Sequence, residues 1–321
     1  MKKLLPFACA AMMLASCADK NAFEITLTVP EDFRNQTILA LNPADGDTLA
    51  MATATDTVVC LKGTIGKPVY AFIVSNNTPL VPLVVEPGKI TVTDDGVTGS
   101  PSNDQYTQLA QQAQGDAGDE QLIRNFMLEH PANPYSLMLF NQYIYLADTT
   151  LIDTMSEHNP DLASNPNLAA IRTAAQTRAK TAAGNHYVDF TLTNGAGKET
   201  SLSSLIDGAP LAIVDFWASW CGPCRALTPD LIELHNKYGA KGLRVVGVDV
   251  WERNEEAGPE AAKEMNIPYP ILYGGTQETT DLYGIMGIPT VLVIDNAGTI
   301  IARDIHGEEL NATVANYFEK K

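Results

Sequence analysis

Two cysteines separated by two residues, Cys221 and Cys224, stand where a buried strand passes into a helix. The apolar run at residues 211–214 precedes them and is typical of a buried strand. Apolar residues then recur at spacings of three and four, which predicts a helix carrying Leu227, Leu231, Leu234 and Tyr238 on one face. Two thiols in the first turn of a helix can close a small disulfide ring, and the positive end of the helix dipole favours a thiolate on the first. The junction therefore predicts thiol–disulfide exchange through a redox-active Cys221–Cys224 disulfide, without another cofactor.

The residues around the pair indicate a division of roles between the two sulfurs. Cys221 comes first and lies nearest the start of the helix, so we assign it as the attacking and attacked thiol, and Cys224 as the resolving thiol. Pro223 falls in the first turn, where a missing N–H costs nothing, and Gly222 permits the close approach of a partner backbone. Trp220 is expected to flank the exposed sulfur as an apolar contact, although surface packing alone explains it equally well.

Two other uses of such a cysteine pair fit this chain poorly. A zinc site needs two more ligands, but the chain has no second cysteine pair, and its histidines are scattered without ligand spacing at 130, 158, 186, 235 and 306. A structural disulfide stabilises most by closing a long loop, whereas this pair closes almost none. We therefore expect no metal site.

The segment from Trp220 to Arg225, with the sequence WCGPCR, resembles the active-site motif of thioredoxin. Asp215 stands where thioredoxins keep a buried aspartate, and the segment GIPT at residues 287–290 resembles the loop whose cis-proline faces the disulfide. The order of segments over residues 185–321, somewhat under half of the chain, is similar to thioredoxin-like domains of the extracytoplasmic TlpA/ResA type. This resemblance implies an α/β fold, with a mixed sheet covered by helices on both faces.

The resemblance also implies roles for residues outside the cysteine motif. Asp215 lies among apolar strand residues, so burial should raise its pKa, and by resemblance it would take the proton from Cys224 as a general base. The alternative is an aspartate at a solvated strand edge. Pro289 would be the cis-proline, and the Ile288 backbone beside it would pair with an extended client segment.

This sequence departs from the family pattern at two positions. The lysine that thioredoxins often place near the buried aspartate falls at Gly247, so water would have to relay the proton. The acid that members devoted to cytochrome c maturation often carry three residues after the second cysteine is Leu227, which weakens the cytochrome-specific interpretation. The Gly-Pro pair between the cysteines resembles the reducing members, so we expect a disulfide reductase kept reduced by a membrane electron donor. The alternatives are a disulfide oxidase or isomerase, or a non-catalytic lipoprotein that only binds partners, against which the intact cysteines argue.

Residues 1–16 are predicted to be a secretory signal. Lys2 and Lys3 precede an apolar run at residues 4–14 that is too short to span a bilayer. The run ends in Leu-Ala-Ser before Cys17, which looks like a bacterial lipobox with Cys17 as the lipidated first residue of the mature protein; the alternative is an ordinary signal peptide. A lipid anchor would hold the protein in the cell envelope, facing the periplasm and its disulfide-containing proteins. The acidic balance, 21 basic against 38 acidic residues, argues against nucleic acid as a partner.

The remaining chain divides into two regions of different character. Residues 17–100 are predicted to form a small antiparallel sandwich or barrel, and they resemble the N-terminal β domain found before thioredoxin-like domains in Bacteroidetes lipoproteins. Cys60 is expected there as a small buried hydrophobe. Residues 103–184 are predicted to be a helical spacer whose core includes Tyr135, Phe140, Tyr143 and Tyr145.

These patterns define the expected elements. Strands are expected at residues 24–29, 37–41, 57–61, 69–74, 80–85 and 89–93, and then at 187–192, 211–214, 243–250, 270–273, 290–295 and 299–304. Helices are expected at 105–114, 120–130, 134–146 and 168–183, and then after Cys221 and at 260–265, 279–284 and 308–318.

Overall fold

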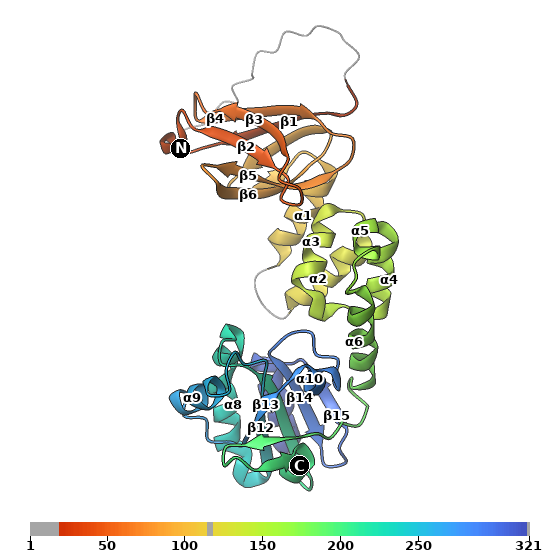
Figure 1. Cartoon of the computed structure of the whole chain (residues 1–321), viewed down its shortest axis with the longest axis vertical. Helices are drawn as coiled ribbons and strands as arrows, with labels where there is room; N and C mark the ends of the chain where they lie inside the picture. Colours follow the sequence, from red (N-terminus) through yellow and green to blue (C-terminus); the bar gives the residue numbers. More distant parts are fainter. Residues whose placement is uncertain (1–18, 114–117, 320–321) are drawn as a thin grey trace. The chain divides into compact units, whose positions relative to one another are not determined.

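The computed structural model describes residues 19–113 and 118–319 (Figure 1). The predicted signal segment and Cys17 lie outside the described residues. The chain divides into two compact units, the first ending at Leu139 and the second beginning at Phe140. This division falls inside the segment 103–184 that we expect to be a spacer, so the helices of that segment are shared between the two units.

The first unit contains two four-stranded sheets that share one apolar core. One sheet has the order β4-β1-β7-β8 and the other β3-β2-β5-β6. Side chains alternate between core and solvent along β1, so that Phe23, Ile25 and Leu27 are buried. The strands are β1 (Ala22–Thr28), β2 (Thr37–Leu41), β3 (Thr48–Thr53), β4 (Val58–Thr64), β5 (Val69–Ser75), β6 (Thr78–Val85), β7 (Gly88–Thr93) and β8 (Gly96–Thr98).

The predicted all-β character of this region is confirmed, with two corrections. β1 and β7 run parallel to each other, so the sandwich is not purely antiparallel. Strands β3 and β8 were not predicted. β3 has the sequence TLAMAT, which is poor in the β-branched and aromatic residues typical of strands, and it forms because it pairs with β2.

Helices follow the sandwich and cross the boundary between the units. They are α1 (Pro101–Gln112), α2 (Gly118–Glu129), α3 (Pro134–Gln142), α4 (Thr149–His158), α5 (Pro160–Ala163) and α6 (Leu168–Lys180). The predicted helix over 134–146 is wrong at its end, because the chain tightens after α3 into a 3-10 turn, η2 (Ile144–Leu146). Tyr135 and Phe140 are core residues as predicted, but Tyr143 and Tyr145 are only half-buried.

The second unit contains a seven-stranded mixed sheet of order β10-β9-β13-β12-β11-β14-β15. β11, β12 and β13 run parallel, and β14 runs antiparallel to β11. The predicted strand at 187–192 forms only from its fifth residue onward. The strands are β9 (Thr191–Asn194), β10 (Glu199–Ser201), β11 (Leu211–Trp217), β12 (Leu243–Val250), β13 (Ile271–Gly275), β14 (Thr290–Asp295) and β15 (Ile300–Arg303).

Helices cover both faces of this sheet, which confirms the predicted α/β class. Ile213 of β11 packs with side chains of α8 (Gly222–Tyr238) and α11 (Gly307–Glu319) on one face. Val214, its neighbour along the strand, packs on the other face with α7 (Leu202–Ile206) and with Tyr283, which follows α10 (Gln277–Asp281). α9 (Ala257–Glu264) follows β12. Within the described ranges, every helix is too short or too polar to cross a membrane.

Candidate active site

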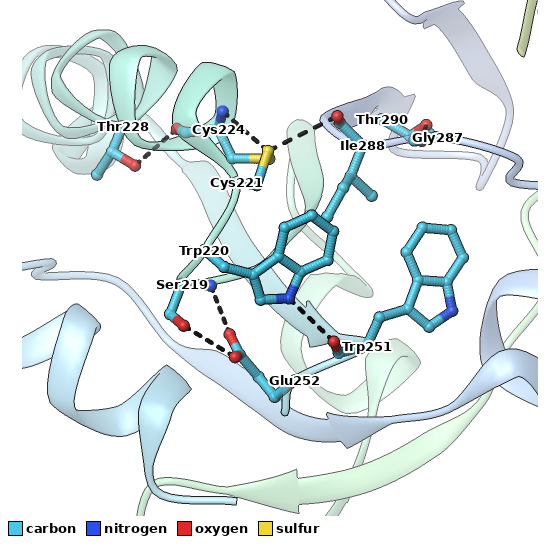
Figure 2. The surroundings of a disulfide bond; sticks show 10 residues. All are labelled: Ser219, Trp220, Cys221, Cys224, Thr228, Trp251, Glu252, Gly287, Ile288 and Thr290. Atoms are coloured by element: carbon cyan, nitrogen blue, oxygen red, sulfur yellow. Dashed lines mark hydrogen bonds between the residues drawn. A yellow bond between two sulfur atoms is a disulfide. The ribbon is translucent and has the colours of Figure 1, made fainter. Parts of the chain in front are cut away.

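The two cysteines lie at the carboxyl end of the central strand β11. The strand ends at Trp217 and α8 begins at Gly222, so Cys221 is the residue that caps the helix. Cys221 and Cys224 form a disulfide with their Cα atoms 5.3 Å apart (Figure 2). The Cys224 backbone N–H points at the Cys221 sulfur, with the nitrogen 3.2 Å from Sγ. An amide at a helix start that faces a sulfur favours the thiolate over the thiol at that atom.

The two sulfurs differ in their access to solvent. Cys221 keeps 4% of its surface exposed, whereas Cys224 is completely buried. Trp220, directly before the pair, is 48% exposed. A side chain on Gly222 would meet nothing within 4 Å, so the protein itself does not crowd this position, and Pro223 occupies the first turn of α8. A partner can therefore reach the pair only at the Cys221 side.

The loop at residues 287–290 lies against the Cys221 sulfur because of the sheet topology. β14 runs antiparallel to β11 and places Thr290 opposite Phe216, so the start of β14 meets the end of β11. The Ile288–Pro289 peptide bond is cis, as predicted. The Ile288 carbonyl oxygen lies 3.6 Å from the Cys221 Sγ (Figure 2). The structure thus brings Cys221, Cys224, Ile288 and Pro289 together in one place.

Asp215 lies inside the sheet on the strand that ends at the cysteines. It is 2% exposed, and burial raises the pKa of its carboxyl to about 7. Its Oδ1 atom finds no hydrogen-bond partner within the described residues. The alternative of a solvated strand edge is therefore wrong, and the predicted direction of the pKa shift is confirmed.

The strand register explains why Asp215 lacks a basic neighbour. Gly247 of β12, where the lysine is expected from the resemblance, lies directly opposite Asp215. A Cβ atom at Gly247 would lie 3.1 Å from both Ile271 Cγ1 and Trp217 Nε1, so these two side chains occupy the space that a larger residue would need. Burial of the Asp215 carboxyl inside the sheet is the physical cause of its raised pKa.

Sequence reasoning missed a carboxylate that holds the segment before Cys221. Glu252, in the loop after β12, accepts hydrogen bonds from the Ser219 backbone N–H and from Ser219 Oγ, the latter at 2.8 Å (Figure 2). The Trp220 indole Nε1 donates to the Trp251 carbonyl oxygen at 3.0 Å. No local pattern of residues in this loop reveals that β12 and β11 end side by side.

A second buried carboxyl, Asp249, was also missed. It lies opposite Trp217 in the β11–β12 register and is 3% exposed. Burial, and after it the neighbouring Glu252, raises the pKa of Asp249 to about 8. Its alternation along β12 places it on the same sheet face as Gly247, and its carboxylate packs against Gly258 of α9. The end of the sheet therefore holds two carboxyls, Asp215 and Asp249, that titrate near neutral pH.

Metal chemistry has no support among the residues that the structure describes. In residues 19–113 and 118–319, no three side chains of histidine, cysteine, aspartate or glutamate gather closely enough to hold an ion. The site thus offers thiols, carboxyls and backbone amides as its reactive groups.

Comparison with known proteins points to the same chemistry. Residues 183–303 match the model of the AhpC/TSA family. The chain is 27% identical over 137 residues to thiol-disulfide oxidoreductase ResA of Bacillus thuringiensis subsp. konkukian, covering 43% of this chain and 77% of that protein. It is 32% identical over 125 residues to the thioredoxin-like protein YneN of Bacillus subtilis, covering 38% of this chain and 70% of that protein.

A solved structure is similar over the same part of the chain. It is the thioredoxin domain of a thiol-disulfide oxidoreductase from Bacteroides vulgatus, at 27% identity and a TM-score of 0.39, covering 42% of this chain and 97% of that domain. The sequence matches, together with the cysteine pair between β11 and α8, decide the assignment. The chain belongs to the thioredoxin-like family of thiol–disulfide oxidoreductases.

Proposed function

We propose that this protein is a lipid-anchored, extracytoplasmic protein-disulfide reductase that works through a mixed disulfide at Cys221. One observation carries the proposal: the Cys221 sulfur faces the Cys224 amide on one side and the Ile288 carbonyl oxygen on the other. The first group favours a thiolate, and the second belongs to a backbone segment that an extended client can pair with. A protein disulfide, rather than a small disulfide, is the substrate that uses both groups.

In the first step, the reduced Cys221 thiolate attacks one sulfur of a client disulfide. A new bond forms between Cys221 and that client sulfur, and the client's other sulfur leaves as a thiolate. Trp220 and Gly222 border the attacked sulfur, and the backbone beside Pro289 pairs with the client chain. Pro223 shapes the first turn that holds Cys221 close to Cys224.

In the second step, Cys224 resolves the mixed disulfide. The Cys224 thiol loses its proton to the Asp215 carboxylate and attacks the Cys221 sulfur, so the client's second sulfur leaves as a thiolate. The client has gained two electrons, and the protein holds the Cys221–Cys224 disulfide. With a pKa of about 7, Asp215 can accept this proton and later release it. An external dithiol, which we propose to be supplied by a membrane electron donor, then reduces the disulfide.

The anchor would be carried by Cys17. The sequence around it has the form of a lipobox, and lipidation there would hold the catalytic segment at the periplasmic side of a membrane. Metabolic labelling with a radioactive fatty acid tests this step directly. We expect label on the wild-type protein and none on Cys17→Ser; label that persists in Cys17→Ser would refute the anchor.

Insulin reduction with dithiothreitol tests the enzymatic activity. We expect wild type to accelerate insulin precipitation and Cys221→Ser to lose the acceleration; equal turnover by both proteins would refute the catalytic role. Cys224→Ser should trap a mixed disulfide with extracytoplasmic clients, visible as adducts that a reducing agent dissolves. Alkylation of the pair in living cells decides the direction, because a reductase is expected to be mainly in the dithiol form.

A further inference from the structure

The helical segment that precedes the thioredoxin-like sheet packs against the chain that leads into the loop of Ile288 and Pro289. That segment begins at Phe140 in the second unit and includes η2 and α6. It contacts three residues that precede β14, namely Tyr283, Gly284 and Gly287. The segment is therefore packed directly on the approach to the client-binding loop.

The backbone of α6 is in direct contact with the backbone of Gly284. Gly284 has a positive φ of 59°, and a Cβ atom there would lie 2.1 Å from the Ala174 carbonyl oxygen and 2.5 Å from the Arg178 nitrogen. Only a glycine allows this approach. Thr181, at the end of α6, donates from Oγ1 to the Tyr283 carbonyl oxygen at 3.1 Å. The loop thus rests on the last two turns of α6.

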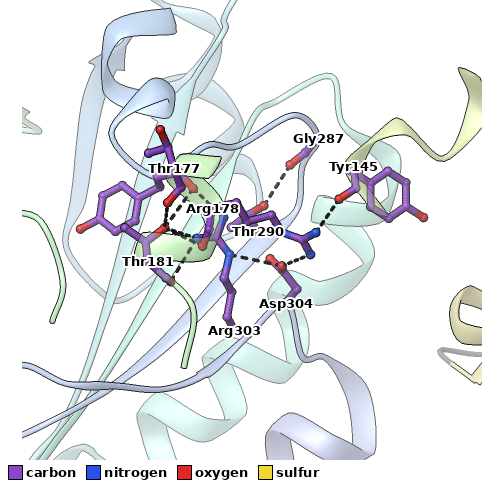
Figure 3. Close-up of polar contacts among 9 residues, drawn as sticks. Tyr145, Thr177, Arg178, Thr181, Gly287, Thr290, Arg303 and Asp304 are labelled. Carbon is purple, nitrogen blue, oxygen red and sulfur yellow. Dashed lines mark hydrogen bonds and ion pairs between the residues drawn. The ribbon is translucent and has the colours of Figure 1, made fainter. Parts of the chain in front are cut away.

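An arginine pair ties the same helix to the sheet (Figure 3). Arg178 of α6 donates to the Tyr145 carbonyl oxygen at 2.8 Å and forms an ion pair with Asp304 at 2.6 Å. Arg303, largely buried, donates to Thr181 Oγ1 at 2.6 Å and to the Tyr283 carbonyl oxygen at 2.9 Å. These are charge-assisted hydrogen bonds between separate elements, and they define where η2 lies relative to β15.

The network places Tyr145 beside the residue that precedes Ile288. A Cβ atom on Gly287 would lie 3.4 Å from Tyr145 Cβ and 3.6 Å from its ring atoms. The Tyr143 and Tyr145 rings lie 6.1 Å apart, and both side chains are half-buried. Gly287 has no side chain of its own, so the space beside its backbone is bounded by the Tyr145 ring.

We propose that Tyr145, held in place through Arg178 and Asp304, is a specificity determinant that favours clients with an aromatic side chain next to the reactive cysteine. The proposal rests on the proposed function, because it concerns the client segment that pairs with Ile288. When that segment extends along residues 287–288, a side chain opposite Gly287 meets the Tyr145 ring. Aromatic pairs add to the stability of such a contact beyond simple burial, whereas a small side chain leaves it unused.

Three disulfide substrates of the full-length protein test the proposal. Two are symmetrical peptide disulfides that differ only in whether phenylalanine or alanine adjoins the cysteine, and the third is hydroxyethyl disulfide, which has no side chain to reach Tyr145. We expect wild type to prefer the phenylalanine peptide by about tenfold in kcat/KM. Tyr145→Leu should lose this preference and Tyr145→Phe should keep it, while turnover of hydroxyethyl disulfide stays within about twofold in both.

Two arginines of α6 provide a test variant and a matched control for the contacts that hold Tyr145. Arg178→Met should weaken the preference because Tyr145 is no longer held, whereas Arg172→Met should not, since the ion-pair partner of Arg172 is Asp153 of α4. An unchanged preference in Tyr145→Leu, with normal turnover of hydroxyethyl disulfide, would overturn the inference. Failure of the wild-type protein to reduce any of the three substrates would instead overturn the proposed function, and the inference with it.

Discussion

Both units bury polar side chains, but they treat them differently. In the first unit, Asn103 is completely buried and accepts from the Val84 N–H and the Tyr135 hydroxyl, while its amide donates to the Val84 carbonyl oxygen and to Ser100 Oγ. Glu86 of the same unit accepts from the Ser102 N–H at 2.8 Å and from Ser102 Oγ at 3.0 Å. In the second unit, Asp215 and Asp249 each bury an oxygen that has no partner in the part of the chain that the structure describes.

The difference separates polar groups that stabilise the fold from polar groups that are available for chemistry. A buried polar atom costs free energy unless it is hydrogen-bonded, so the satisfied groups of the first unit join β6 to the start of α1. An unsatisfied buried carboxyl relieves that cost by holding its proton, and its pKa rises toward neutrality. We therefore expect mutations of the hydrogen-bonded groups in the first unit to change stability alone. Mutations of the unpartnered carboxyls in the second unit should change activity, and also the pH dependence of both activity and stability.

The largest expected effect compares one cysteine from each unit. Cys221→Ser should lower insulin reduction by at least about a thousandfold, because the attacking sulfur is gone. Cys60→Ser, in β4 of the sandwich, should leave activity within about twofold, since that cysteine is outside the disulfide. A large loss in Cys60→Ser would show that the sandwich takes part in the chemistry.

The second effect concerns stability and pH. Asp215 has a folded-state pKa of about 7 against an ordinary value of 3.8, so the folded state holds the proton longer than the unfolded state. The contribution of Asp215 to stability is therefore present below about pH 4 and is lost as the pH rises through 7, by about 4 kcal/mol. Asp215→Asn should lack this loss. The free energy of unfolding of the variant, relative to that of wild type, should therefore increase between pH 4 and pH 8. Urea unfolding of both proteins across this range, with hydrogen exchange of β11, provides the measurement; parallel curves would contradict it.

The same substitution should slow the resolving step. Above pH 7 the Asp215 carboxylate can accept the Cys224 proton, whereas Asn cannot, so Asp215→Asn should release client from the mixed disulfide about a hundredfold more slowly. Stopped-flow decay of the mixed disulfide should rise with pH through about 7 in wild type only. A variant that keeps this pH dependence would assign the base to another group, and Asp249 would be the first to test.

A fourth prediction concerns the buried, hydrogen-bonded polar side chains of the first unit. Asn103→Ala leaves the Val84 amide and carbonyl without their partner, so we expect a loss of about 2 kcal/mol in the unfolding free energy of the first unit. Insulin reduction by the folded protein should be unchanged. Asn125→Ala, at an exposed position on α2 where the Asn125 side chain accepts a hydrogen bond from Gln121, is the matched control. Equal stability of the two variants would mean that the buried network contributes little.

The smallest expected effect concerns the carboxylate that holds Ser219. Glu252→Gln keeps an acceptor for Ser219 but removes the charge that helps to raise the pKa of Asp249, so that pKa should fall from about 8 toward the ordinary aspartate value. Carbon-detected NMR titration of the aspartate carboxyls measures the shift. Glu255→Gln, an exposed position in the same loop, should leave it unchanged. An unaltered titration of Asp249 in Glu252→Gln would show that burial alone sets its pKa.

Local sequence patterns predicted the elements that depend on short-range physics. The run of apolar residues in β11, the leucine spacing of α8 and the cysteine pair between them are all visible within some thirty residues. The proline of the cis peptide bond lies farther along the chain, but its own short GIPT segment marks it. Asp215 could be assigned a raised pKa because its strand neighbours are apolar. Elements of weak local preference escaped prediction: β3 forms by pairing with β2, and α4 begins where Asp148 caps it by accepting the Leu151 N–H.

The sequence by itself determined the reactive chemistry of this protein, because a Cys-x-x-Cys pair at a strand–helix junction is a local feature of covalent spacing and helix polarity. Only the tertiary structure decided what surrounds that chemistry. The meeting of Glu252 with Ser219, of Asp249 with the end of β11, and of Tyr145 with Gly287 joins residues that are between 32 and 142 positions apart, as the residue numbers show. Such contacts follow from strand order and helix packing, which no local pattern of residues records.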